Sequence, residues 1–148
     1  MDLESIKKLR EETGAGVMDA KLALESSNGD IAKAQELLKA RGLEKAGKKS
    51  DREIKAGRVF SYIHNGGMVG SIVKLGCETD FVAKNEKFEK LGNEIAMQIA
   101  AMDPENVKEL KKQVYIRDSS KTIEDLVKET ISTIGENITI VEMSRLSI

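Results

Sequence analysis

The stretch Cys77-Glu78-Thr79-Asp80-Phe81-Val82-Ala83-Lys84-Asn85 joins a predicted strand to a predicted helix. Thr79 or Asp80 supplies a helix-start signal, because either side chain can accept a hydrogen bond from the free N–H groups of a first turn. A large ring, Phe81, follows at once in a chain with only 3% aromatic residues. Two interpretations are open: a core residue that caps the sheet, or an anchor presented to a partner, a common role of aromatic side chains at interfaces.

A β-hairpin is predicted before this stretch, from Arg58 to Glu78. Asn65-Gly66-Gly67 is its turn signal, because asparagine and glycine accept the positive φ angles of tight turns. With a three-residue loop, the facing pairs are His64 with Met68, Val59 with Val73, and Ile63 with Val69, the last two on the core face. The opposite face then carries Phe60, Tyr62 and Ile72. That face is apolar enough to predict a covering partner.

Two helices and a third strand are predicted after the stretch. The first helix spans Asn85 to Met102 and has an apolar stripe at helical spacing. The second opens at Thr122-Ile123-Glu124-Asp125, which resembles a capping box, and ends at Gly135. Asn137 to Met143 is β-branched and reads as a strand. Residues 55–148 are therefore predicted to form an α+β core, a small three-stranded antiparallel sheet packed with helices.

Three short helices are predicted over residues 1–42. None is long enough to be stable alone, so they are expected to share one small core as a three-helix bundle. Such bundles resemble ubiquitin-associated (UBA-like) domains. Gly42 stands where a terminating glycine belongs. Residues 43–54 are rich in lysine and lack an apolar stripe, which predicts a basic linker.

The composition points to a soluble cytoplasmic protein. The net charge is −1, and 33% of the residues are charged. No run approaches the ~18 apolar residues that a membrane span needs. Met1 to Glu4 is acidic and does not resemble a targeting signal. Bacterial cytoplasm is therefore the expected location, with no membrane contact.

The sequence offers little for catalysis. Cys77 and His64 are the only thiol and imidazole. Cys77 lies nine positions beyond Met68, the expected neighbour of His64, which is roughly 30 Å at ~3.3 Å per residue. Gly14-Ala15-Gly16 follows no strand and lacks the third glycine of a dinucleotide-binding loop. We therefore expect no enzyme activity, no metal site and no cofactor.

The basic stretch from Lys39 to Arg58 is the one candidate for nucleic-acid contact. Single-strand recognition combines cations with aromatic stacking platforms, and this stretch contains no aromatic residue. A solvated linker is the favoured interpretation, and no direct nucleic-acid binding is expected.

Three separated motifs carry a resemblance to a known family. Lys7 to Lys21 is similar to the pattern K-x-L-R-x-x-T-G-A-G-x-M-D-x-K, Thr79 to Val82 reads T-D-F-V, and Ile134 to Ile138 reads I-G-E-N-I. Their order and spread over nearly the whole chain resemble the elongation factor Ts family. Leu22 departs from the pattern, since many members carry a basic residue there.

A larger departure is an apparent internal deletion. Members of the family usually have several dozen more residues, largely helical, between segments that end near Val107 and restart near Leu110. The chain then has one shortened core unit of the family's dimerisation type, as the family's short forms do. The resemblance implies self-association as a homodimer, with Phe60, Tyr62 and Ile72 as one candidate surface.

The resemblance also implies a function: nucleotide exchange on elongation factor Tu, in its GDP-bound and nucleotide-free forms. In the family, the N-terminal bundle docks on the partner, and the phenylalanine of T-D-F-V wedges near the partner's Mg²⁺ site. The docking region falls here on Leu9, Arg10, Thr13, Gly14, Ala15, Gly16, Val17, Met18, Asp19 and Lys21. The region that dislocates the partner's Mg²⁺ falls on Thr79, Asp80, Phe81 and Val82. Asp80 would cap the short helix that holds the ring.

Two other hypotheses remain open. A ribonucleoprotein-type module would bind a protein through the bundle and RNA through the basic linker, with steep salt dependence. An adaptor would use the UBA-like bundle alone. Neither hypothesis gives T-D-F-V or I-G-E-N-I a role.

Overall fold

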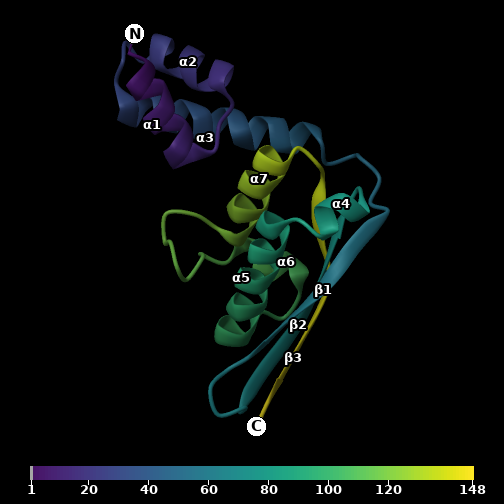
Figure 1. Ribbon diagram of the computed structural model, residues 1–148. Helices are drawn as coiled ribbons and strands as arrows, with labels where there is room; N and C mark the ends of the chain where they lie inside the picture. The colour runs from purple at the N-terminus through teal and green to yellow at the C-terminus, as the bar shows by residue number, and fades with distance from the viewer. Residues whose placement is uncertain (1) are drawn as a thin grey trace.

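The computed structural model describes residues 2–148, which form helices and one sheet (Figure 1). In chain order the elements are α1 (Leu3–Thr13), α2 (Val17–Ser26), α3 (Ile31–Lys48), β1 (Ala56–Ile63), β2 (Val69–Cys77), α4 (Asp80–Ala83), α5 (Glu86–Met102), α6 (Val107–Lys112), α7 (Ile123–Ile134) and β3 (Ile138–Ser147). The α+β class with a three-stranded antiparallel sheet is thus confirmed.

The N-terminal helices pack around a core of their own. Asp2 and Asp30 cap α1 and α3, each accepting a hydrogen bond of 3.1 Å from a first-turn N–H. The buried side chains are small or aliphatic: Leu9, Ala20, Ala23, Leu24, Ala34 and Leu38. Alanines let the helices approach closely, so the short α1 and α2, of 11 and 10 residues, bury their apolar stripes against the 18-residue α3.

Gly42 does not end a helix, contrary to the expectation from its position. Helix α3 continues through it to Lys48, so half of the expected linker is helical. The glycine is needed for packing, because a Cβ there would lie 3.0 Å from the Ser132 hydroxyl oxygen on α7. Helix α3 therefore passes from the N-terminal bundle directly onto the second core.

The hairpin register differs by one residue from the predicted one. Phe60 pairs with Val73 and Ile63 with Gly70, in place of Val59 with Val73 and Ile63 with Val69. The loop is one residue longer because Gly66 and Gly67 both take positive φ angles, +85° and +71°. His64 N–H then donates to Val69 O across a four-residue loop.

This shift turns the side chains of β1 to the opposite face of the sheet, since side chains alternate along a strand, while those of β2 keep their predicted faces. Phe60 and Val73 are buried, while Val59 and Ile63 are exposed. The predicted outer surface of Phe60, Tyr62 and Ile72 is therefore wrong, because Phe60 and Tyr62 face the helices and Ile72 alone faces outward.

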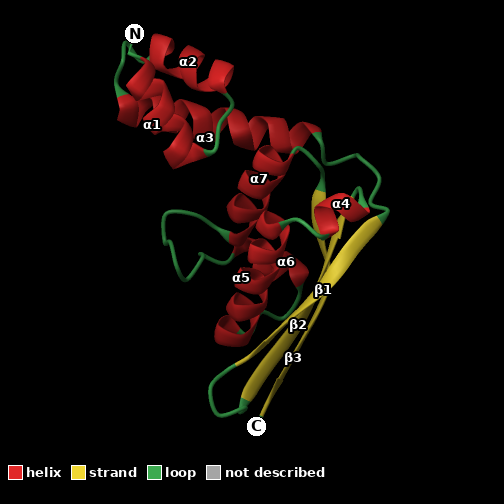
Figure 2. Ribbon diagram, viewed as in Figure 1, coloured by secondary structure: helices red, strands yellow, loops and turns green. Residues whose placement is uncertain are grey.

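Helices cover one face of the sheet only (Figure 2). Helix α5 packs closest, because Gly92 leaves room for the Phe60 ring, which meets Phe88 edge-on at 5.7 Å between centroids. Helix α7 packs against α5 and also contacts α3. The opposite face exposes a set of aliphatic side chains: Val59, Ile63, Ile72, Val141 and Leu146.

Membrane-spanning character is not found in residues 2–148. None of their helices combines the length and apolarity that crossing a bilayer requires.

Candidate partner-binding site around Phe81

The Phe81 ring points away from the protein. Its exposed fraction is 89%, so the interpretation as a core residue is wrong. The ring sits on α4, a four-residue helix placed between the end of β2 and the start of α5 (Figure 1). The next two residues, Val82 and Ala83, are buried against the core. They hold one side of the turn, and Phe81 is presented from the other side.

The cap of α4 is Thr79, and Asp80 is the first helical residue. Thr79 has extended backbone angles, and its hydroxyl oxygen accepts from Val82 N–H at 3.4 Å. The expectation that Asp80 caps the helix is thus wrong. The exposed Asp80 carboxylate instead lies in the first turn, where negative charge is favoured by the helix dipole.

Glu136 holds the start of α4 from the other end of the core. Its carboxylate accepts two hydrogen bonds from Thr79, one from the backbone N–H at 3.0 Å and one from the hydroxyl at 2.8 Å. The two residues are 57 positions apart in sequence. The T-D-F-V and I-G-E-N-I segments are therefore in direct contact.

In a second set of hydrogen bonds, the I-G-E-N-I segment donates to the residue that precedes T-D-F-V. Glu78 accepts from Asn137 N–H at 3.1 Å and lies 3.8 Å from Arg52. The Asn137 side-chain amide donates to the carbonyls of Ser50 and Arg52, at 3.3 and 2.9 Å. Three chain segments are tied together here. Sequence reasoning missed this junction, because no local pattern in either motif indicates a contact between residues 57 positions apart.

Cys77 lies beneath this junction as a buried, neutral thiol. Its Sγ donates to Thr79 O at 3.2 Å. Burial, together with the nearby Glu136 carboxylate, raises the pKa of Cys77 above its usual value. His64 lies at the far end of the hairpin, bonded to Tyr62. Within residues 2–148, no cluster of three or more His, Cys, Asp or Glu side chains suited to a metal ion occurs.

The T-G-A-G loop joins α1 to α2 in a fixed conformation. Gly14 takes a φ of +70° and its N–H donates to Arg10 O at 2.8 Å, which ends α1. Arg10 in turn donates to Ala15 O at 3.2 Å. Of the other expected docking residues, Val17 and Met18 expose their apolar side chains to solvent, at 50% and 64%. Such residues suit a docking surface.

The remaining expected docking residues differ in accessibility. Leu9 is fully buried in the bundle core, so its predicted direct contact with a partner is wrong. Lys21 is exposed, and Asp19 is occupied by an ion pair of 3.0 Å with Lys45. Helix α4 packs on β1, β2 and α5, whereas α1 packs on α2 and α3, so two separate surfaces result.

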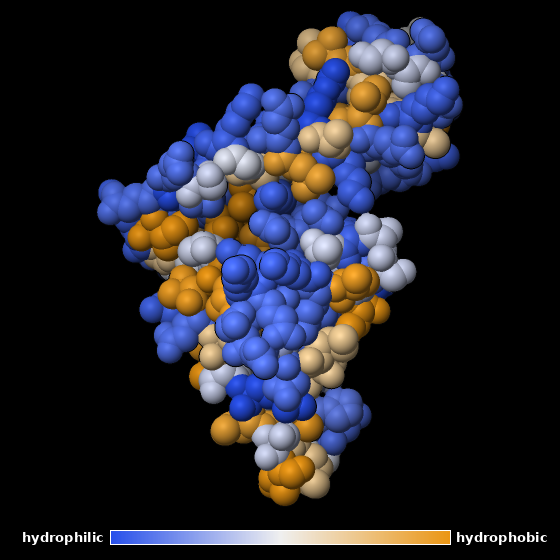
Figure 3. Space-filling view, turned by 180° about the vertical axis from the view of Figure 1, so that it is seen from behind, coloured by the Kyte–Doolittle hydropathy of each residue, from blue (hydrophilic) through white to orange (hydrophobic). Residues whose placement is uncertain are grey.

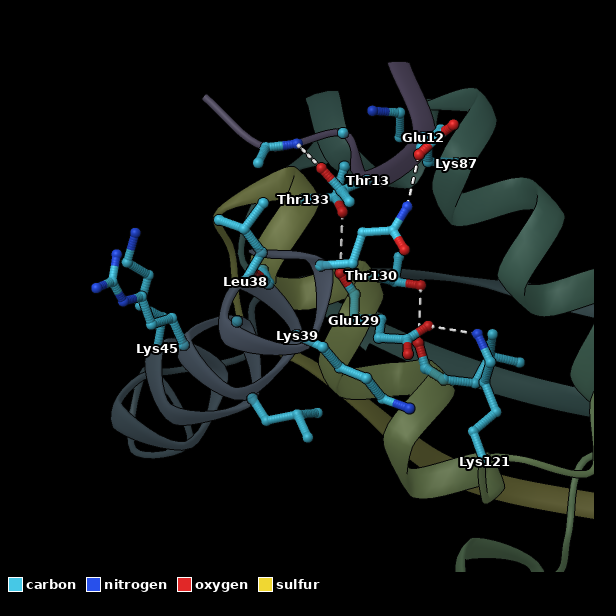
Figure 4. Close-up of a pocket in the computed structure, with 18 of the residues that line it drawn as sticks. Glu12, Thr13, Leu38, Lys39, Lys45, Lys87, Lys121, Glu129, Thr130 and Thr133 are labelled. Carbon is cyan, nitrogen blue, oxygen red and sulfur yellow. Dashed lines mark hydrogen bonds and ion pairs between the residues drawn. The ribbon is translucent and has the colours of Figure 1, made fainter. Parts of the chain in front are cut away.

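An open cleft of about 1140 Å³ lies between the bundle and the second core (Figure 4). Its walls come from α1, α3, α5 and α7 and carry both signs of charge. Several charged groups are already paired, as in Gln35 with Glu12 and Lys121 with Glu129. The lining resembles an ordinary charged surface, and its residues do not form a cluster suited to one class of ligand.

Comparisons with known proteins identify the family. A sequence model described as Elongation factor TS matches residues 78–148, which contain both T-D-F-V and I-G-E-N-I. Elongation factor Ts of Leptospira biflexa is 43% identical over 190 aligned positions, covering 98% of this chain and 96% of the relative. The chain belongs to the elongation factor Ts family. It is thus a translation elongation factor.

Other relatives agree. Elongation factor Ts of Fervidobacterium nodosum is 38% identical over 98% of this chain and 96% of the relative. That of Oleidesulfovibrio alaskensis is 39% identical over 97% and 95%. The alignment with the Leptospira protein has 190 positions, whereas this chain has 148 residues. Since nearly all of both proteins is covered, the relative carries residues inside the alignment that this chain lacks.

Proposed function

We propose that this chain is a guanine-nucleotide exchange factor for elongation factor Tu. The exposed Phe81 ring enters the partner near its Mg²⁺ site, and the N-terminal bundle docks on the partner's nucleotide-binding domain. The proposed activity breaks no covalent bond. Support comes from the family membership and above all from the exposure of Phe81, 89%, on an otherwise anchored turn.

The mechanism is one of linked binding equilibria. An exchange factor binds the nucleotide-free partner more tightly than the GDP-bound partner. By reciprocity, it weakens GDP binding by the same factor by which GDP weakens its own binding. A large ring inserted beside the Mg²⁺ site favours the nucleotide-free state because it displaces groups that support the metal and the phosphates. Both nucleotide states of the partner therefore bind this chain, with different affinities.

Replacement of the ring tests this proposal. Phe81→Ala removes an exposed side chain, so the free energy of unfolding should change by less than ~0.5 kcal/mol. GDP release from elongation factor Tu, followed by stopped-flow fluorescence of a labelled nucleotide, should slow at least tenfold, as for an aromatic interface anchor.

Val114→Ala is the matched control. Val114 is also apolar and exposed, at 51%, but it lies in the segment before α7, away from α4. Its rate should equal that of the unchanged protein. A wild-type rate for Phe81→Ala would rule out the wedge.

The N-terminal docking surface is proposed on Val17, Met18 and the T-G-A-G loop. The two exposed apolar side chains support it, and the rigid glycine turn allows close approach to a partner backbone. The buried Leu9 contributes by holding α1 in the bundle.

The basic segment is proposed to serve structure and not nucleic acid. Lys45 pairs with Asp19 at 3.0 Å, Lys48 with Glu44 at 3.4 Å. Arg52 lies 3.8 Å from Glu78 and donates to Gly135 O. Three cations of the segment therefore have contacts within the protein, and the segment holds no aromatic side chain on which a base could stack.

Self-association as a homodimer is proposed through the outer face of the sheet, not through the face expected from the sequence. Its exposed aliphatic side chains form a surface that a monomer would leave in water. A second copy fits by symmetry, because two such sheets can pack face to face. Lys74 on β2 and Glu142 on β3 lie opposite each other in the sheet and put one charge of each sign on this face. In a two-fold dimer, the lysine of one copy can face the glutamate of the other.

A further inference from the structure

Helix α4 cannot fix the direction of Phe81 by itself. A helix of four residues is far below the length at which backbone hydrogen bonds stabilise a helix in water. The ring makes no packing contribution, being 89% exposed. Its orientation therefore depends on what holds the residues on either side. On the C-terminal side these are Val82 and Ala83, which are buried.

On the N-terminal side the anchor is Thr79, and Thr79 is held by Glu136. Both oxygens of the carboxylate are used, at 3.0 Å to the backbone N–H and 2.8 Å to the hydroxyl. The hydroxyl donates to Glu136 and accepts from Val82 N–H, so the same atom links the carboxylate to the turn that carries the ring. Hydrogen bonds to an ionised carboxylate are shorter and stronger than those between neutral groups.

Glu136 is itself held in place. The Gly135 carbonyl accepts from Arg52 at 3.4 Å, and Asn137 N–H donates to Glu78 at 3.1 Å. The loop after α7 is thus fixed on both sides of Glu136. Because this loop is held on both sides, the Glu136 carboxylate can restrain Thr79. A carboxylate on a mobile loop would move together with Thr79 and would not restrain it.

We propose that Glu136 is a positioning residue for exchange: it orients the Phe81 ring through Thr79 and so lowers the entropic cost of inserting the ring into the partner. The proposal rests on the proposed exchange function and adds a residue that does not reach the partner itself. A side chain ordered before binding loses less conformational freedom on binding, and the gain appears as affinity for the nucleotide-free partner.

The test compares three substitutions. Glu136→Ala removes both hydrogen bonds to Thr79, and GDP release should slow about tenfold, the usual effect of losing a hydrogen bond to a charged group. Glu136→Gln should recover most of the rate, because its amide oxygen can accept from the backbone N–H and its amide nitrogen can donate to the hydroxyl. Glu105→Ala is the control, an exposed glutamate just before α6 whose side chain has no hydrogen bond or ion pair within residues 2–148, and its rate should not change.

A double-mutant cycle separates positioning from other effects. If Glu136 acts through the ring, Glu136→Ala should slow exchange less than twofold when Phe81 is already alanine. Additive losses would overturn the proposal while leaving the wedge intact. A wild-type rate for Phe81→Ala alone would instead remove the proposed function, and the positioning role with it.

Amide hydrogen exchange of the free protein supplies a readout without the partner. Glu136→Ala should increase the exchange rate of the Thr79 amide severalfold, because that N–H loses its acceptor, and leave β2 and α5 protected. Loss of protection throughout β2 and α5 would assign Glu136 to the stability of the fold and overturn the proposal. Unchanged protection at Thr79 would overturn it as well.

Discussion

At the scale of single residues, Gly92 sets how closely α5 packs on the sheet. An added Cβ there would overlap the Phe60 ring, which is itself packed on Phe88. The helix can approach the sheet this closely only without a side chain at that position.

Gly92→Ala is therefore expected to destabilise the protein. The better helix propensity of alanine favours the variant by up to ~1 kcal/mol. Forcing a methyl group into a filled core costs about 1–3 kcal/mol or more, and the ring has no empty space to enter. Urea unfolding should show a lower midpoint. Gly47→Ala in α3 is the control, because nothing lies within 4 Å of its Cβ, and a rise in stability is expected there. Equal midpoints for the two variants would contradict this account.

Residue roles were predictable only where one position carries its own signal. An aromatic ring beside a helix-start signal left two interpretations of Phe81 open, and only the family resemblance favoured the exposed one; the cap assigned to Asp80 is Thr79. The bonds of Glu136 to Thr79 were not predictable, since nothing local relates residues 57 positions apart. Leu9 was placed in the docking surface because it lies within a motif, and only the packing of the bundle shows that it is buried.

At the scale of elements, α3 connects the two cores. Gly42 lies against Ser132 of α7, and a Cβ on Gly14 would lie 3.7 Å from Thr133 of the same helix. The N-terminal bundle, proposed to bind the same partner as Phe81, is thus held against α7 of the second core. The relative position of the bundle and Phe81 should matter for exchange.

Gly42→Leu should push α3 away from α7, because a branched side chain has no room beside Ser132. We expect slower GDP release from elongation factor Tu in the stopped-flow assay, with the bundle and the second core still folded by amide exchange. Gly47→Leu, five positions on in open space, should leave the rate unchanged. Equal rates for both variants would show that the α3–α7 contact does not position the bundle.

The elements themselves were largely predictable, and their boundaries and register were not. Helical periodicity and caps located the long helices, and the Asn-Gly-Gly turn located the hairpin. The register was missed because loop length depends on how many residues take positive φ angles, which residue types permit but do not specify. One residue of error moved Phe60 from the outer face to the core.

At the scale of the whole molecule, the outer face of the sheet exposes aliphatic side chains that no helix covers. Figure 3 shows apolar residues gathered at the lower end of the protein, where Figure 1 places the hairpin turn and the C-terminus. Met68, Leu146 and Ile148 are exposed there. These residues extend the outer face to the end of the sheet.

Ile63→Asp tests the proposed homodimer. Ile63 is 66% exposed on the outer face, so aspartate should not disturb the fold of a monomer. In a dimer the unpaired carboxylate would be desolvated, which opposes association. Sedimentation analysis should give a dimer for the unchanged protein and a monomer for the variant. Lys7→Asp on the exposed side of α1 should remain dimeric. A monomeric unchanged protein at all concentrations would refute the proposal.

The junction of Thr79 with Glu136 has a consequence for synthesis. A ribosome delivers the two residues at different times, with the whole of α5, α6 and α7 made between them. When Phe81 has left the ribosome and Glu136 has not, the nascent chain can already form the hairpin. Its Phe81 ring then lacks the restraint that the hydrogen bonds between Glu136 and Thr79 provide. The proposed anchor is therefore restrained only after Glu136 has also been made, so chains terminated before Glu136 should lack this restraint and bind the partner less well.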